Sequence, residues 1–121
     1  MPSKPLEVYM EHVKECGTGN SYVQVAQSEM LRLENVPLSM EMATLFLHWQ
    51  KISLTLEFSQ RDTKSRWGTA WPKKRKVVLY RHSVWTFLHE VAHVVAGHHG
   101  HVGVFPVALR GLYLAWRELE S

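Results

Sequence analysis

The chain has 121 residues, of which 45% are hydrophobic and 21% charged, a composition typical of a globular fold, and we expect one domain over residues 1–121. A single cysteine excludes an internal disulfide and a cysteine-based metal site. The N-terminus lacks a signal-peptide pattern, and no segment approaches the roughly 20 apolar residues of a membrane span. We therefore expect a cytoplasmic protein without a membrane partner.

The net charge of +3 is distributed unevenly along the chain. Residues 1–60 carry four Lys or Arg against seven Glu, whereas residues 61–82 carry eight Lys or Arg against one Asp. Such a basic segment could contact DNA or an acidic partner through residues 61–81. The candidate contacts are Lys64, Arg66, Lys73, Lys74, Arg75 and Lys76. A solvated, lysine-rich hairpin is the simpler alternative.

Helical periodicity dominates the first half of the chain. Apolar residues recur at helical spacing in residues 5–16 and again in about 21–34. Pro37 ends this region, and Ser39 is a candidate N-cap for a third helix. We expect the apolar face of that helix to consist of Met42, Leu45, Phe46 and Trp49.

The period then changes, because apolar residues alternate in residues 53–58. Alternation predicts a strand there. Residues 67–71 and 76–80 are predicted to form two further strands, joined by a turn at residues 72–75. Gly68 inside a strand predicts a bulge or a close backbone approach.

Two further helices are predicted after the strands. Ser83 can cap a helix at about 84–97, and Gly97 suits its C-terminal end. That helix is apolar nearly all round, which predicts burial in the middle of the domain. A last helix is expected at about 104–119. The order of helices, a three-stranded mostly antiparallel sheet and two more helices predicts an α+β fold.

Residues 89–101 hold five of the eight histidines and begin with His89-Glu90-Val91-Ala92-His93. In this pattern two imidazoles one helical turn apart bind zinc, and the Glu between them acts as general base. Burial of two His and one Glu in an apolar helix is costly unless they are hydrogen-bonded or bind a metal. We therefore predict a zinc site here, against the alternative of hydrogen-bonded core residues.

The spacing leaves the third ligand open. His99 lies at the metzincin distance from His89, although Ala96 stands where that pattern has Gly. His101 lies four residues before Phe105, at the start of the last helix. Further candidates are His98, Glu118 and Glu120.

Several motifs occur in the order typical of the SprT-like and YgjP-like zinc metalloproteases, which the chain resembles over about residues 53–116. The motifs are Ser65-Arg-Trp-Gly-Thr69, Phe87-Leu-His-Glu-Val-Ala-His93 and His101-Val-Gly-Val-Phe105. The resemblance implies a small zincin-like domain in which a central HExxH helix and a closing C-terminal helix build the site. It also implies that His89, His93 and His101 bind one Zn²⁺ ion and that Glu90 is the general base.

These motifs predict a zinc-dependent metallopeptidase that hydrolyses a protein or peptide substrate through a zinc-activated water. If strand 76–80 is the edge strand above the central helix, it could hold an extended substrate by strand addition. One alternative is a metal-dependent hydrolase of a non-peptide amide or ester. The other is a DNA-associated binding module in which His98 or His99 closes a structural zinc site.

Overall fold

The computed structural model describes residues 5–15, 32–60 and 66–120. Most of the helix expected at 21–34 and the loop expected at 61–64 lie outside these ranges. The described end of the former contains a single 3-10 turn, η1 (Leu33–Asn35).

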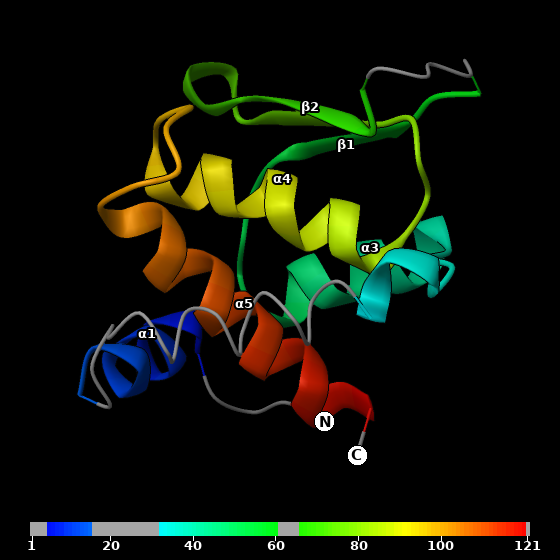
Figure 1. The fold of residues 1–121 in the computed structure, drawn as a ribbon. Helices are drawn as coiled ribbons and strands as arrows, with labels where there is room; N and C mark the ends of the chain where they lie inside the picture. Colours follow the sequence, from blue (N-terminus) through cyan, green and yellow to red (C-terminus); the bar gives the residue numbers. More distant parts are fainter. Residues whose placement is uncertain (1–4, 16–31, 61–65, 121) are drawn as a thin grey trace.

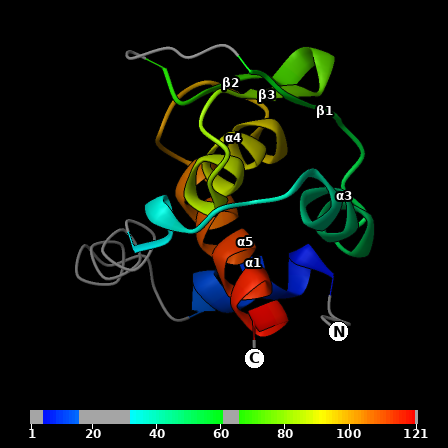
Figure 2. The same cartoon turned by 90° about the vertical axis from the view of Figure 1, so that its right-hand side faces the viewer.

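The fold is arranged in layers around one helix, α4 (Val84–Ala96), as Figures 1 and 2 show. A small sheet covers one side of α4, and α5 (Val104–Glu120) packs against the opposite side. Helix α1 (Leu6–Glu15) packs on α5, and α3 (Met40–Trp49) flanks the layers. The α+β class predicted from the sequence is confirmed, as is the central place of α4.

Local signals at both ends define α4. The Ser83 hydroxyl accepts a hydrogen bond from the backbone N–H of Thr86 at 3.3 Å. At the other end Gly97 adopts a left-handed conformation with φ of 81°, and its N–H donates to the carbonyl of His93 at 2.9 Å. Both caps are those predicted from the sequence, since N-capping hydroxyls and left-handed glycines act locally.

The sheet is mixed, and the prediction of a mostly antiparallel sheet is wrong in this respect. Its strands are β1 (Thr55–Phe58), β2 (Gly68–Trp71) and β3 (Lys76–Leu79), in the order β1-β3-β2. Strand β3 is parallel to β1 and antiparallel to β2, to which it is joined by the 3-10 turn η2 (Pro72–Lys74). Because β3 is the central strand, strand 76–80 is not the edge strand required for strand addition.

The segment before α3 fixes the start of α4. The backbone N–H of Val84 donates to Val36 O, and that of Leu38 donates to His82 O, both at 3.0 Å. Phe46 of α3 then packs its ring against Phe87 of α4 at 5.8 Å between centroids. These contacts connect α3 to the central helix, which carries the His-Glu-x-x-His motif.

The buried face of α3 differs from the predicted one. Its N-cap is Ser39, as expected, with the N–H of Met42 donating to the Ser39 hydroxyl at 3.1 Å. However, Met42 and Leu45 are each 37% exposed, while the core side of the helix consists of Ala43, Phe46 and Leu47. Apolar residues occur on more than one face of α3, so periodicity alone selected the wrong neighbours of Phe46.

Helices α1 and α5 approach each other closely at Gly111. A Cβ on Gly111 would lie 2.9 Å from Met10 Cγ, so a larger residue here would require the Met10 side chain or the helix to shift. The Tyr9 hydroxyl donates a short hydrogen bond to the carboxylate of Glu118, across the same pair of helices.

None of the helices in the described ranges is long and apolar enough to cross a membrane.

Candidate metal centre

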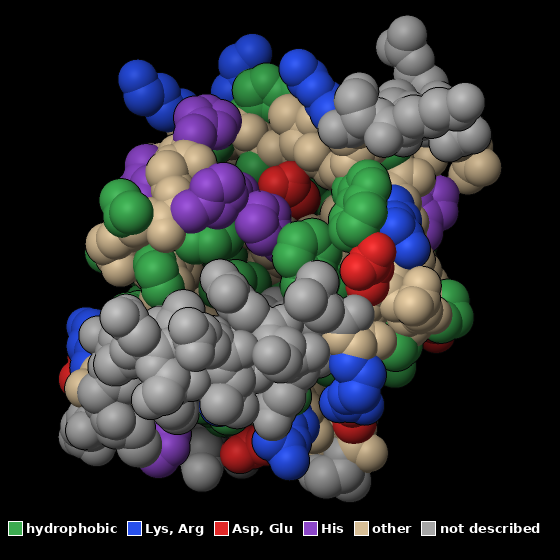
Figure 3. Space-filling model, viewed as in Figure 1, with side chains coloured by type: hydrophobic (Ala, Val, Ile, Leu, Met, Phe, Trp, Pro, Cys, Tyr) green, Lys and Arg blue, Asp and Glu red, His purple; other side chains and the backbone are tan. Residues whose placement is uncertain are grey.

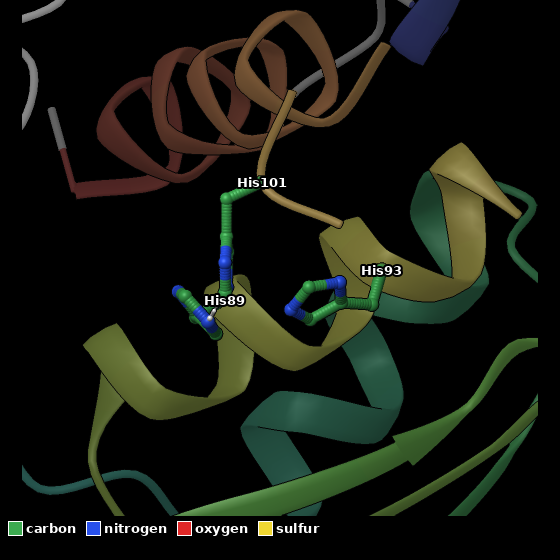
Figure 4. Close-up of side chains that lie close together, drawn as sticks. All are labelled: His89, His93 and His101. Carbon is green, nitrogen blue, oxygen red and sulfur yellow. Dashed lines mark hydrogen bonds between the residues drawn. The ribbon is translucent and has the colours of Figure 1, made fainter. Parts of the chain in front are cut away.

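Three imidazoles converge where α4 meets the loop that leads to α5 (Figure 4). His89 and His93 extend from α4 one turn apart, and His101 reaches them from the loop. One nitrogen of each ring lies within 4.8 Å of the other two, and the Nε2 atoms of His89 and His101 are 3.3 Å apart. Two nitrogens bound to one tetrahedral zinc ion are separated by about 3.3 Å. The three side chains are therefore close enough to hold a metal ion.

An outer hydrogen bond orients His93. Its Nδ1 lies 3.1 Å from the carbonyl oxygen of His98. Because a carbonyl can only accept, Nδ1 carries the proton, and Nε2 keeps its lone pair for a metal. A backbone carbonyl in this position is a usual outer partner of metal-binding histidines. His98, considered above as a ligand, instead contributes its backbone.

The environment favours the neutral form of the His89 and His93 imidazoles. Burial, followed by the charges of His93 and His101, lowers the pKa of His89 to about 4. Burial also lowers the pKa of His93. Since only the deprotonated ring nitrogen binds a metal, both shifts favour the form that can act as a ligand.

Glu90 is buried between α4 and β2. Burial raises the pKa of its carboxyl group to about 7. A Cβ on Gly68 of β2 would lie 2.8 Å from Glu90 Cγ and 3.2 Å from Glu90 Oε2. Gly68 thus lies at a close approach, but the group that approaches is the side chain of Glu90 and not the backbone that the sequence predicted.

Two aromatic rings contact the histidines. Phe105, the first buried residue of α5, contacts all three imidazoles, with ring centroids 5.2 Å from His89, 4.4 Å from His93 and 4.9 Å from His101. Trp85 stacks on His89 at 5.0 Å with an angle of 24° between the rings. Trp85 was missed by the sequence analysis, although its spacing of four residues before His89 places both on one helical face.

The other candidate ligands lie apart from this cluster. The ring of His99 is 6.4 Å from that of His93, and within the described ranges His99 does not join the group of three. Glu118 is bonded to Tyr9, and Glu120 accepts a hydrogen bond from Trp116 Nε1 at 2.8 Å. The structure therefore brings together His89, His93 and His101, the set implied by the family resemblance.

The candidate basic residues that the structure describes lie in or next to β2, η2 and β3, and Figure 3 shows Lys and Arg side chains along the sheet side of the molecule. Lys73 and Lys74 are exposed in η2. Two others have partners, since Arg75 Nε donates to Ser53 O at 2.7 Å and Lys76 Nζ lies 5.6 Å from the Trp71 ring. Arg66 is exposed, and Lys64 lies outside the described ranges. A contact with DNA remains a prediction.

No protein-family model matches the chain, and neither a curated protein nor a solved structure matches it. The similarity to SprT-like and YgjP-like proteases therefore remains a prediction from the motifs. Functional conclusions depend on the chemistry of the site itself.

Proposed function

We propose that the protein is a zinc-dependent metallopeptidase in which His89, His93 and His101 hold the ion and Glu90 is the general base. The observation that carries this proposal is the convergence of three imidazole nitrogens within 4.8 Å. The helix that supplies two of them also carries the buried carboxyl group of Glu90.

The number of donors supports catalysis over a purely structural site. Structural zinc sites usually have four protein ligands, whereas catalytic sites have three and one open position. Within the described ranges the group has three members, and neither His98 nor His99 adds a fourth. This favours the peptidase over a binding module with a structural zinc.

The chemistry of Glu90 suits proton transfer near neutral pH. A zinc ion held by the three imidazoles supplies Lewis acidity and lowers the pKa of a water molecule. Burial raises the pKa of Glu90 to about 7, and a general base is most effective when its pKa lies near the working pH. Glu90 accepts a proton from the attacking water and then returns it to the leaving amine.

The sheet supports a peptide as substrate. Among the described strands, β2 is an edge strand, because it is hydrogen-bonded only to β3. Strand β2 also packs against α4. Its residue Gly68 lies directly against Glu90. An extended peptide added to the free edge of β2 would run past this carboxylate, which favours a peptide over a small amide or ester.

The test compares the wild type with Glu90→Gln, with Glu57→Gln on the exposed face of β1 as matched control. We expect the wild type to cleave an unfolded protein, to lose activity with a chelator and to regain it with zinc. Glu90→Gln should keep its zinc, measured by mass spectrometry, and lose about 100-fold to 10,000-fold in rate. Full activity of Glu90→Gln would refute the mechanism, and cleavage of small amides or esters alone would favour the alternative hydrolase.

A further inference from the structure

The second ring nitrogen distinguishes His89 from His93. His93 Nδ1 is held by the carbonyl of His98, as described above. His89 Nδ1 is buried and has no hydrogen-bond partner among the described residues. Since metal-binding histidines are usually oriented by such an outer bond, the ring of His89 requires another means of orientation.

Stacking on Trp85 provides that orientation. The centroids of the two rings lie 5.0 Å apart, and the angle between the ring planes is 24°. The rings of these residues, which lie one helical turn apart, are therefore stacked nearly parallel. Phe105 meets the His89 ring at 5.2 Å and 70°, so the imidazole is held by two aromatic neighbours. A partial rotation of the imidazole about its Cβ–Cγ bond would break the nearly parallel contact with Trp85, so the stack restrains the plane of the ring in which Nε2 lies.

Trp85 is itself held in place. The ring centroids of Trp85 and Trp67 lie 5.8 Å apart, and the angle between the ring planes is 76°, so the contact is edge-on. The guanidinium of Arg81 lies 4.3 Å from the centroid of the Trp67 ring. Arg81 Nη1 forms an ion pair with Glu34 Oε1 at 3.1 Å. The backbone also contributes, because the N–H of Arg81 donates to the carbonyl of Trp67 at 2.8 Å. Hydrophobic and basic side chains next to the histidines are visible on the face shown in Figure 3.

We propose that Trp85 is a positioning residue of the metal centre, whose stacked indole directs His89 Nε2 toward the ion in place of an outer hydrogen bond. Trp67, fixed by Arg81, supports Trp85 in this position. The inference rests on the proposed metal centre and assigns an outer contact to His89, whose buried Nδ1 has no hydrogen-bond partner among the described residues.

Metal affinity and ligand geometry provide the test. The variants are Trp85→Leu, which removes the ring, and Trp85→Phe, which keeps a smaller one, with Trp49→Leu in α3 as a half-buried tryptophan control. Affinity is measured by competition with a chromogenic chelator, and geometry from the visible spectrum of the cobalt-substituted protein. Trp85→Leu should lose about 10-fold to 100-fold in affinity and change the spectrum, the loss typical of an outer partner. Trp85→Phe should recover most of both, and Trp49→Leu should change neither.

Wild-type affinity and spectrum in Trp85→Leu would overturn the inference while leaving the proposed function intact. Absence of metal from the wild type would overturn the proposed function and the inference with it. If Trp85→Leu does not fold, Trp67→Leu serves instead, because Trp67 is 36% exposed and touches His89 only through Trp85. We then expect a smaller loss of affinity with a shifted cobalt spectrum, and an unchanged spectrum would overturn the inference.

Discussion

Gly68 and Glu90 are matched across the contact between β2 and α4, because the missing side chain of one makes room for the carboxylate of the other. A Cβ on Gly68 would lie 2.8 Å from Glu90 Cγ and 3.2 Å from Glu90 Oε2, distances that require one of the two residues to move. The three histidines are on α4 and the loop after it, so this contact affects the proposed base and not the proposed ligands.

Gly68→Ala should therefore separate catalysis from metal binding. We expect the rate of peptide hydrolysis to fall by about 100-fold, the size of effect that a misplaced catalytic group produces. Bound zinc should stay at the wild-type level, and the free energy of unfolding should fall by about 1–3 kcal/mol through overpacking. Gly100→Ala is the control, because its added Cβ would have its nearest neighbour at an ordinary 3.4 Å. Wild-type activity in Gly68→Ala would contradict the placement of Glu90.

Replacement of His101 and His99 in separate variants tests the ligand set. His101→Ala should weaken zinc binding by more than the roughly 10-fold to 100-fold typical of outer partners, because it removes a ligand. His99→Ala should bind zinc like the wild type, since its ring lies outside the group of three. Isothermal titration of zinc into the two variants distinguishes them. The reverse order of affinities would assign the third ligand to His99.

Tyr9→Phe tests the contact between α1 and α5. Burial, then the hydrogen bond and charge of Glu118, raise the pKa of Tyr9 above its ordinary value of 10. The folded chain holds this proton more tightly than the unfolded chain, so the contribution to stability is present below pH 10 and is lost as the pH rises above it. Tyr9→Phe should lose about 1 kcal/mol at neutral pH and show less alkaline destabilisation than the wild type. Urea unfolding at neutral pH and above pH 10 measures the two free energies, with Tyr80→Phe as control. Identical alkaline unfolding curves for Tyr9→Phe and the wild type would contradict the prediction.

Ser83→Ala tests the N-cap of α4. The hydroxyl is buried, caps Thr86 N and shares a 2.9 Å hydrogen bond with Thr86 Oγ1, so its loss leaves buried polar groups unpaired. We expect the free energy of unfolding to fall by about 1–2 kcal/mol. Ser39→Ala removes the cap of α3, which is exposed, and should cost less. Equal losses in thermal unfolding would show that burial of the cap has no effect.

Features encoded by neighbouring residues were predicted well. Ser83, Gly97 and the spacing of His89 and His93 act within one or two helical turns, so the sequence was sufficient to place α4 and its motif. The prediction at Gly68 was correct only in part, because the group that approaches this glycine is the side chain of Glu90, from a different element, and not a backbone.

Features that depend on distant residues were not predictable in the same way. The short apolar run in Lys76–Leu79 does not by itself identify the neighbouring strands, and the parallel pairing of this segment with Thr55–Phe58 gives it the central position. The stack of Trp85 on His89 could have been predicted from the sequence, since both residues lie on one face of one helix. Its importance depends on the absence of a hydrogen-bond partner for His89 Nδ1 among the described residues, which is a three-dimensional property.

The short distance in sequence between the three candidate ligands also affects the unfolded chain. His89, His93 and His101 lie within thirteen consecutive residues that contain five histidines, so only a short loop must close for an unfolded chain to chelate zinc. A ligand that also binds the unfolded state stabilises the folded state less than its affinity for the folded state implies. We therefore expect zinc to raise the melting temperature less than its measured affinity predicts, and a denatured chain to retain part of its zinc.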